Sequence, residues 1–375
     1  MKGASRTPFV LVSSDQRRLS ALGACLLDHA PHTPSEFILS LPKAELHLHL
    51  EGTVDPPTLS DLSRKHTTPF PWENNRYKPL PDSNRPLTPE QARDLYEYEN
   101  FTGFLMAFKA VTERMRDPDD YELVTYRLMQ KLAAQRVLHA EVFVSVGVVF
   151  WRGQDFDPLF EGMERGRQRG ERDFGVSLLW IFDAVRHFGP DEGHKVLDKA
   201  LQFQTRNVVG IGIGGDERQA GPDLFGDVYR RAGRHGLRLS AHAGETVGPE
   251  SIAGALDHLN AERIGHALHA GEDVGLMERL IRDRVPLEIC ITSNIRTGCC
   301  GGYAAHPVRD FFDAGALITL NSDDPEMFET SLAREYQIAQ DHYGFSNEEL
   351  AQLARNSFKA SWLPEERKRE FLAIF

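Results

Sequence analysis

The chain of 375 residues is long enough to bury a large core without disulfides or a structural metal. Its 55 acidic and 43 basic residues give a formal net charge of −12, which argues against a broad surface for nucleic acids or anionic membranes. The four cysteines form no CxxC pair, and no apolar run approaches the length of a membrane span. We therefore expect a protein of a reducing, cytoplasmic compartment.

Residues 1–35 are predicted to form an N-terminal extension, either poorly ordered or packed on the outside of the molecule. The apolar stretch from Pro8 to Val12 is too short for the hydrophobic region of a signal peptide. Residues 36–375 are predicted to form a single domain, because they contain no evident repeat or low-complexity tract.

Short apolar runs recur along this domain and are separated by segments of helical character, a pattern typical of parallel βα units. The predicted strands are Ala44–His49, Val137–Val146, Val176–Phe182, Val208–Ile213, Leu237–His242, Arg263–His266, Val285–Cys290 and Leu317–Asn321. Eight strands favour an α/β fold of the (β/α)8 TIM-barrel class over an open, doubly wound sheet. No GxGxxG sequence follows the first strand, which removes the usual dinucleotide-binding signature.

The first two strands are almost 90 residues apart, which predicts a helical insertion after strand 1. Within it, Phe101, Phe104, Leu105 and Phe108 recur at the spacing of one helix face. Packing against the core is the favoured interpretation of this face, and a lid over a binding pocket is the alternative. The proline-rich stretch 69–89 is predicted to be an irregular connection across the barrel mouth.

The first strand carries two histidines in alternate positions of the sequence AELHLHLEG. Alternate side chains of a strand project to the same face, so His47 and His49 can bind one metal ion. His242 ends the fifth strand, at the end where active sites of α/β barrels gather, and is a candidate third ligand. Glu245 follows in the next turn and can reach the same cavity.

Asp323 and Asp324 follow the eighth strand in the sequence NSDDP, and His266 ends the sixth strand in RIGH. Adjacent residues leave a strand in different directions, so one carboxylate can face a metal and the other a bound ligand. The alternative for this pair is a turn or a helix cap. Three histidines and one carboxylate suit zinc, although iron, cobalt and nickel accept the same ligand types. The fourth strand ends without the lysine that bridges two metals in related barrel hydrolases, so we expect one metal per chain.

Five motifs together, HLHLEG, GDE, HAGE, RIGH and NSDDP, resemble the adenosine deaminase family in content and order, from residue 43 to about residue 340. The resemblance implies a (β/α)8 barrel, one Zn²⁺ per chain and hydrolytic deamination of an adenine ring. It implies a purine nucleoside or base as the small-molecule partner. The metal ligands that it implies are His47, His49, His242 and Asp323.

The same resemblance assigns roles to the remaining motif residues. Glu245 would protonate N1 of the purine, and His266 would orient the attacking water and help to activate it. Asp324 would share a hydrogen bond with N7, with the proton on either partner. The backbone N–H of Gly215 would donate to N3, since glycine lets the chain approach the ring closely.

Three features bear on the group attached to the purine. Glu51 stands where members acting on adenosine carry aspartate, and this longer carboxylate resembles the adenine branch or a site for an altered 5′ group, as in aminodeoxyfutalosine. We expect Glu51, with His49, to contribute to substrate binding. The segment Thr292–Gly298, in contrast, resembles the SNxxTG sequence of nucleoside-acting members, and Phe143 stands where many members have arginine.

The sequence therefore predicts a deaminase of adenosine or of a close 5′-modified analogue, with adenine and aminodeoxyfutalosine as alternative substrates. An amide or phosphoester hydrolase on the same barrel is a less favoured class. A catalytically silent nucleoside-binding protein is disfavoured by the presence of Glu245 and His266. The H-x-E and P-C-x-x-C signatures of polynucleotide deaminases do not occur together, so no nucleic-acid substrate is expected. No sequence feature specifies the oligomeric state.

Overall fold

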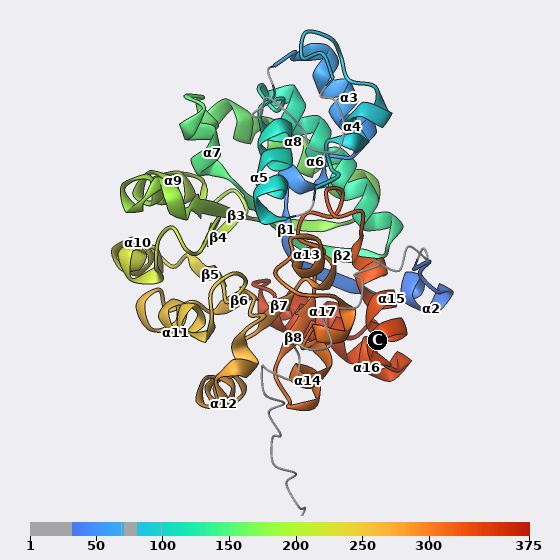
Figure 1. The fold of residues 1–375 in the computed structure, drawn as a ribbon, viewed down its shortest axis with the longest axis vertical. Coiled ribbons are helices and arrows are strands. Elements are labelled where there is room, and N and C mark those ends of the chain that lie inside the picture. The colour runs from blue at the N-terminus through green and yellow to red at the C-terminus, as the bar shows by residue number, and fades with distance from the viewer. Residues whose placement is uncertain (1–31, 69, 71–80, 99) are drawn as a thin grey trace, which may run out of the picture.

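Eight parallel strands form the centre of the molecule in the computed structural model, which describes residues 32–68, 70, 81–98 and 100–375. Neighbouring strands along the chain are neighbours in space, in the order β1 to β8, with helices around them (Figure 1). The strands are β1 Lys43–His49, β2 Val137–Val144, β3 Ser177–Val185, β4 Val208–Gly214, β5 Arg238–Ala243, β6 Arg263–His266, β7 Leu287–Ile289 and β8 Ile318–Leu320. The predicted (β/α)8 barrel is confirmed.

The barrel closes between its first and last strands through the segment that follows β8. Leu48 and Asp323 form an isolated parallel bridge. The backbone N–H of His49 donates to the carbonyl of Asp323 at 2.9 Å, and the N–H of Asp323 donates to the carbonyl of His47 at 3.1 Å. The backbone itself thus places the paired histidines of β1 beside the aspartates after β8.

All eight predicted runs are strands, but several of their ends differ from the prediction. Strand β2 stops two residues early because Val146 already begins helix α7 (Val146–Trp151). Strand β3 continues to Val185 because its last three residues pair with β4. Strands β7 and β8 are three residues long, since they pair with each other only over those residues.

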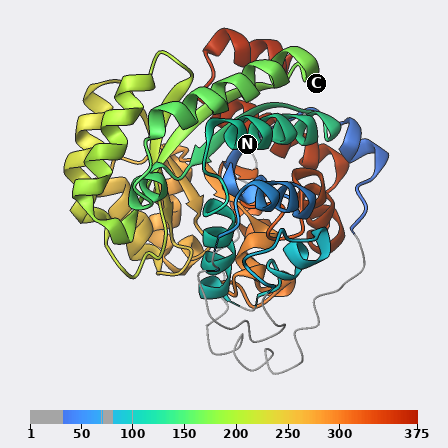
Figure 2. The same cartoon turned by 90° about the horizontal axis from the view of Figure 1, so that it is seen from above.

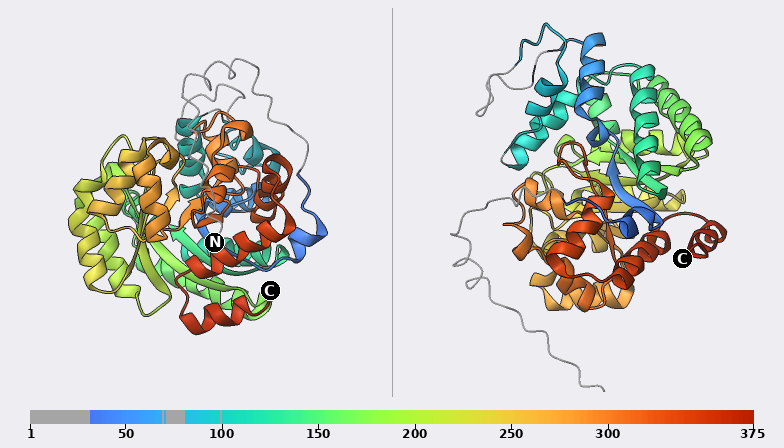
Figure 3. Two further views of the ribbon diagram at one scale, coloured as in Figure 1. Left: turned by 90° about the horizontal axis from the view of Figure 1, so that it is seen from below. Right: turned by 90° about the vertical axis from the view of Figure 1, so that its right-hand side faces the viewer.

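Helices cover the outside of the strands and connect one strand to the next (Figures 2 and 3). They are α2 Glu36–Ser40, α3 Pro56–Lys65, α4 Pro89–Asp94, α5 Phe101–Thr112, α6 Pro118–Ala134, α7 Val146–Trp151, α8 Phe156–Phe174, α9 Pro190–Phe203, α10 Gly226–Arg234, α11 Pro249–His258, α12 Val274–Asp283, α13 Ile291–Arg296, α14 Val308–Asp313, α15 Leu332–Tyr343, α16 Asn347–Ala360 and α17 Glu365–Leu372. None of these helices has both the length and the apolar character needed to cross a membrane.

Four helices, α3 to α6, form the predicted insertion between β1 and β2, gathered at one side of the barrel in Figure 3. Helix α5 begins where the Asn100 side chain accepts a hydrogen bond from the Gly103 N–H, an ordinary N-cap. Of the predicted connection at 69–89, residues 69 and 71–80 lie outside the described residues, as do residues 1–31 of the predicted extension.

Candidate active site

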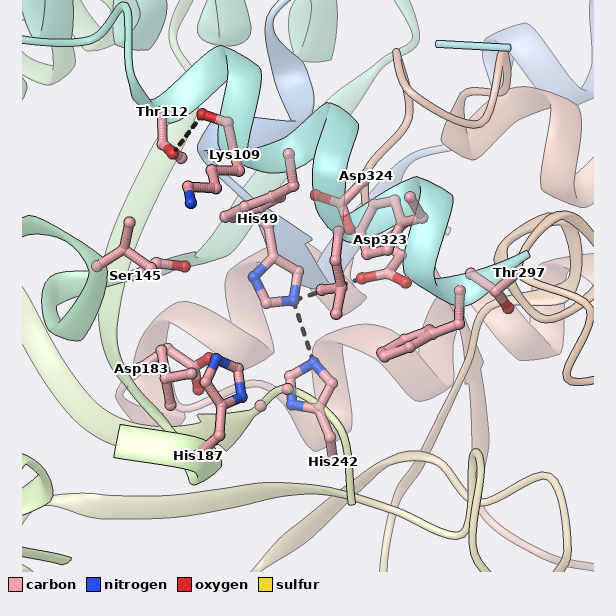
Figure 4. Close-up of a pocket in the computed structure, with 18 of the residues that line it drawn as sticks. His49, Lys109, Thr112, Ser145, Asp183, His187, His242, Thr297, Asp323 and Asp324 are labelled. Carbon is pink, nitrogen blue, oxygen red and sulfur yellow. Dashed lines mark hydrogen bonds and ion pairs between the residues drawn. The ribbon is translucent and has the colours of Figure 1, made fainter. Parts of the chain in front are cut away.

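Four side chains from three parts of the barrel meet at one point. His47 and His49 lie on β1, His242 on β5 and Asp323 directly after β8, and each offers a ligand atom within 4.8 Å of the other three. The Nε2 atoms of His49 and His242 are 3.1 Å apart (Figure 4). Oδ1 of Asp323 lies 3.4 Å from Nε2 of both His47 and His49. This convergence is the one that the sequence motifs predict.

Hydrogen bonds behind the cluster fix which atom of His47, His242 and Asp323 faces it. Nδ1 of His47 lies 2.8 Å from a carboxylate oxygen of Glu288, and Nδ1 of His242 lies 3.0 Å from the carbonyl of Ile213. Each Nδ1 therefore holds a proton, and Nε2 is the nitrogen that each ring directs at the cluster. The hydroxyl of Ser293 donates to Oδ2 of Asp323 at 2.6 Å, which leaves Oδ1 for the cluster.

The charge around these four side chains favours a divalent cation. Burial alone would lower the pKa of His47, but the carboxylates of Asp323 and Glu288 raise it to about 10. His47 Nε2 is buried and finds no hydrogen-bond partner among the described residues. Burial lowers the pKa of His49 to about 3 and that of His242 well below its usual value, so both imidazoles are neutral. These two neutral nitrogens and the ionised carboxylate suit a divalent cation, which would take the place of the proton that His47 holds beside Asp323.

Glu245 stands in the loop after β5, and Glu217 holds that loop in place. The carboxylate of Glu217 accepts the backbone N–H groups of Gly244, Glu245 and Thr246 at 2.8–2.9 Å. Burial raises the pKa of Glu245 well above its usual value, and the charges of Asp323 and Glu217 raise it further. This shift favours the carboxylic acid form of Glu245, the form that can donate a proton.

His266 ends β6 beside Glu245, with its Nε2 3.8 Å from Oε2 of that carboxyl group. Its backbone has φ of +64°, and Asp323 has φ of +65°. Residues other than glycine occupy this left-handed region at a cost of roughly 1–3 kcal/mol, and such strain is concentrated at functional sites. The fold thus holds two candidate functional residues in strained backbone conformations.

Asp324 and Gly215 line the same cavity as the cluster. Burial raises the pKa of Asp324 well above its usual value, as do the neighbouring Asp323 and Glu51 carboxylates, and its Oδ1 has no hydrogen-bond partner among the described residues. This shift favours the protonated form of Asp324, which can act as a hydrogen-bond donor. Gly215 follows β4 with φ of +88°, and a Cβ at this position would lie 3.2 Å from the ring of His187.

Glu51 occupies a different place from these residues, because it lies behind the cavity wall. It is 2 % exposed, does not belong to the described lining, and accepts the backbone N–H of Ser145 at 3.0 Å. Phe143 lies on strand β2, and its ring stacks on the imidazole of His49, with the two ring centroids 5.1 Å apart. An aromatic ring thus supports the metal-facing histidine where arginine stands in many family members.

The cavity has a volume of about 370 Å³ and continues from the cluster along helices α5 and α7. The apolar face of α5 lines it, and the same residues pack on the core, so both interpretations of that face apply. Lys109 is the only lysine or arginine among the described lining residues, and it points into the cavity from α5 (Figure 4). Its ammonium group lies 4.5 Å from the ring centroid of Trp151, which stacks on Phe188.

Several residues of the site have no role in the sequence analysis. Glu217 lies in the GDE motif, but its hydrogen bonds to the Glu245 loop depend on a fold in which β4 and β5 are neighbours. Glu288 lies in the middle of the apolar strand β7, and an acidic residue in such a position indicates a buried polar or charged partner. Lys109 follows the apolar face of α5 and has no motif of its own.

The sequence model of the adenosine deaminase family matches residues 42–374. The chain belongs to the adenosine deaminase family. It is therefore a hydrolase of the class that acts on C–N bonds in cyclic amidines, and the metal-fitting cluster lies where this family's motifs predict it.

Named relatives within the family act on different adenine compounds. The chain is 37% identical to an aminodeoxyfutalosine deaminase of Streptomyces avermitilis, over 87% of this chain and 88% of that protein. It is 34% identical to an adenine deaminase of Chlorobium phaeobacteroides, over 90% of this chain and 97% of that protein. The structure of an adenine deaminase from Arthrobacter aurescens superposes with a TM-score of 0.81, at 31% identity, over 89% of this chain and 98% of that one. The names of these three relatives refer to aminodeoxyfutalosine or adenine, and none refers to adenosine.

Proposed function

We propose that the protein deaminates the adenine ring of a nucleoside with a large, anionic 5′ substituent, of the aminodeoxyfutalosine type, with one zinc ion per chain. The observation that carries this proposal is the shape of one cavity. The metal-fitting cluster and the protonated Glu245 lie in it together with an aromatic wall, and that wall ends at a single lysine.

Three histidines and one aspartate would hold the zinc ion, and the cavity leaves room for water beside them. When bound, zinc supplies a Lewis acid that makes water a nucleophile near neutral pH. Attack at C6 of the purine moves negative charge onto the ring nitrogens. The carboxylic acid of Glu245 neutralises that charge by giving its proton to N1, and His266, beside Glu245, orients the attacking oxygen. The bond between C6 and its amino nitrogen then breaks, and ammonia leaves.

Two further groups would hold the purine ring. Asp324 carries a proton, so it donates a hydrogen bond to N7, and N7 needs no proton of its own. The N–H of Gly215 donates to N3, and the absence of a side chain lets the ring approach the backbone. These two contacts orient C6 toward the metal-facing side of the cavity.

The far half of the cavity supports the choice of 5′ group. In aminodeoxyfutalosine, the ribose carries a keto-linked carboxyphenyl group on its 5′ side. The aromatic side chains of α5 and α7 suit the phenyl ring, and the Lys109 ammonium suits its carboxylate. Glu51 contributes indirectly, because it fixes the backbone of Ser145, which lines the cavity. A free adenine base would leave this half without a partner.

An ammonia-release assay with adenine, adenosine, methylthioadenosine and aminodeoxyfutalosine tests the proposal. We expect the highest kcat/KM for aminodeoxyfutalosine. Lys109→Met should lower that value by roughly 10- to 100-fold, the loss typical of one charge-assisted hydrogen bond, and should leave methylthioadenosine turnover unchanged. Lys195→Met, which removes an exposed lysine paired with Glu192, is the control. A preference for free adenine, or equal losses on both nucleosides in the Lys109 variant, would contradict the assignment of the 5′ group.

A further inference from the structure

A chain of hydrogen bonds runs from the imidazole of His266 to Asn294 and from Asn294 to His306, and neither partner has a part in the proposed reaction. Asn294 lies on α13, and its amide nitrogen is 3.1 Å from Nδ1 of His266. The amide oxygen of Asn294 is 3.2 Å from Nε2 of His306. All three side chains are buried, with exposed fractions of 1 %, 0 % and 6 % for His266, Asn294 and His306.

A backbone donor fixes the direction of this chain of hydrogen bonds. The N–H of Val308 can only donate, and it lies 3.2 Å from Nδ1 of His306, so that nitrogen holds no proton. Burial lowers the pKa of His306 to about 3, which keeps its ring neutral with the proton on Nε2. The Nε2–H donates to the amide oxygen of Asn294, and the NH₂ group is therefore the part of Asn294 that faces His266.

The NH₂ group of Asn294 donates to Nδ1 of His266, so the proton of that imidazole is on Nε2, the nitrogen nearer Glu245. We propose that Asn294, oriented by His306, is a positioning residue that keeps His266 in the Nε2–H tautomer. In this tautomer His266 donates a hydrogen bond to the attacking oxygen and does not accept its proton. The inference rests on the deaminase chemistry of the family and is independent of the 5′ group.

The isosteric substitution Asn294→Asp tests the role of the amide. An ionised carboxylate only accepts, so it would draw the His266 proton to Nδ1 and leave Nε2 without one. We expect kcat to fall by roughly 10²- to 10⁴-fold, the range seen when a catalytic histidine is held in the wrong tautomer or a general acid–base group is lost. KM and the metal content should stay as in the wild type. Asn356→Asp is the matched control, because Asn356 is also buried but donates to the carbonyl of Ile318, outside the cavity.

A pair of substitutions at His306 tests the orientation of Asn294. His306→Gln keeps an N–H donor for the amide oxygen and should retain kcat within about 10-fold, since one neutral hydrogen bond is preserved. His306→Leu removes the donor and should lose nearly as much as Asn294→Asp. Equal activity of the two His306 variants would overturn the proposed direction of the chain.

The tautomer can be observed directly, without turnover. In ¹⁵N-histidine-labelled protein, with the His266 signals assigned by their absence in His266→Gln, we expect a protonated Nε2 and an unprotonated Nδ1. This pattern should appear in both the metal-free and the zinc-loaded protein. A protonated Nδ1 in the wild type would overturn the inference, as would equal losses of kcat in Asn294→Asp and Asn356→Asp. Because this measurement uses no substrate, it can fail while the proposed substrate class stands.

Discussion

Glu245 is the carboxyl group of the site on which proton transfer depends. Glu217 accepts three successive backbone N–H groups of the Glu245 loop, and burial raises the pKa of Glu245 well above its usual value. Glu245→Gln keeps the shape of the side chain and removes the acid. We expect kcat to fall by roughly 10²- to 10⁴-fold with unchanged metal content, as measured by steady-state kinetics and elemental analysis. Wild-type turnover in this variant would remove Glu245 from the reaction.

The raised pKa of Glu245 also predicts how activity depends on pH. The acid must be protonated to donate, so its contribution is present below the raised pKa and is lost as pH increases through it. The kcat/KM profile of the wild type should therefore decline on the alkaline side. The residual activity of Glu245→Gln should lack that decline, because an amide does not titrate. The same alkaline decline in both proteins would assign it to another group.

The motif residues of the site could be predicted from the sequence because each lies at or just after the end of a strand. Parallel strands of a barrel bring those ends together, as they do for His47, His242 and Asp323. Asn294 was recognised as part of its segment, but its partners His266 and His306 lie 28 and 12 residues away. Only the fold shows that Asn294 meets these two histidines and not other buried polar groups.

At the scale of elements, the approach of the His47 ring to strand β6 depends on a glycine. A Cβ on Gly265 would lie 2.6 Å from Cε1 of His47, and the hydrogen bond between Nδ1 and Glu288 restrains this ring. Gly265→Ala should displace this imidazole, weaken zinc binding and destabilise the fold by roughly 1–3 kcal/mol. Metal titration and thermal unfolding measure the two effects.

Gly193→Ala provides the control for Gly265→Ala. Gly193 lies within helix α9, where a Cβ would make ordinary contacts at 3.4 Å with Phe225 and Val228. This substitution should leave metal affinity unchanged. If Gly265→Ala bound zinc as tightly as Gly193→Ala, the position of His47 would not depend on this contact.

The order of the elements could also be predicted, because eight apolar runs with helical segments between them fit one closed topology. The ends of the strands could not be predicted, because a strand ends where its neighbour ceases to pair with it. Strand β3 continues three residues beyond the prediction because Asp183, Ala184 and Val185 still pair with β4. Lys109 was missed for a related reason: the packing of α5 over the barrel, not its periodicity, turns that side chain into the cavity.

At the scale of the whole molecule, the proposed metal ligands meet where the backbone pairing of the barrel is shortest. Strands β3 and β4 pair over six residues, whereas β1 and the segment after β8 share one isolated bridge. The seam between β1 and that segment has His47 and His49 on one side and Asp323 on the other. A bound ion would therefore join the first and last strands and stabilise the closed barrel.

Removal of the metal should then lower the stability of the whole chain and loosen this seam first. Binding of zinc at a free concentration of 1,000 times its Kd adds about 4 kcal/mol to the free energy of unfolding, so a chelator should lower Tm by several degrees. Hydrogen exchange should accelerate in β1 and in the residues after β8 more than in β3 and β4, which carry none of the four ligands. His242→Ala, which lacks one ligand, should respond little to the chelator. If metal-depleted wild-type protein kept both its Tm and the slow exchange of β1, the ion would not contribute to closing the barrel.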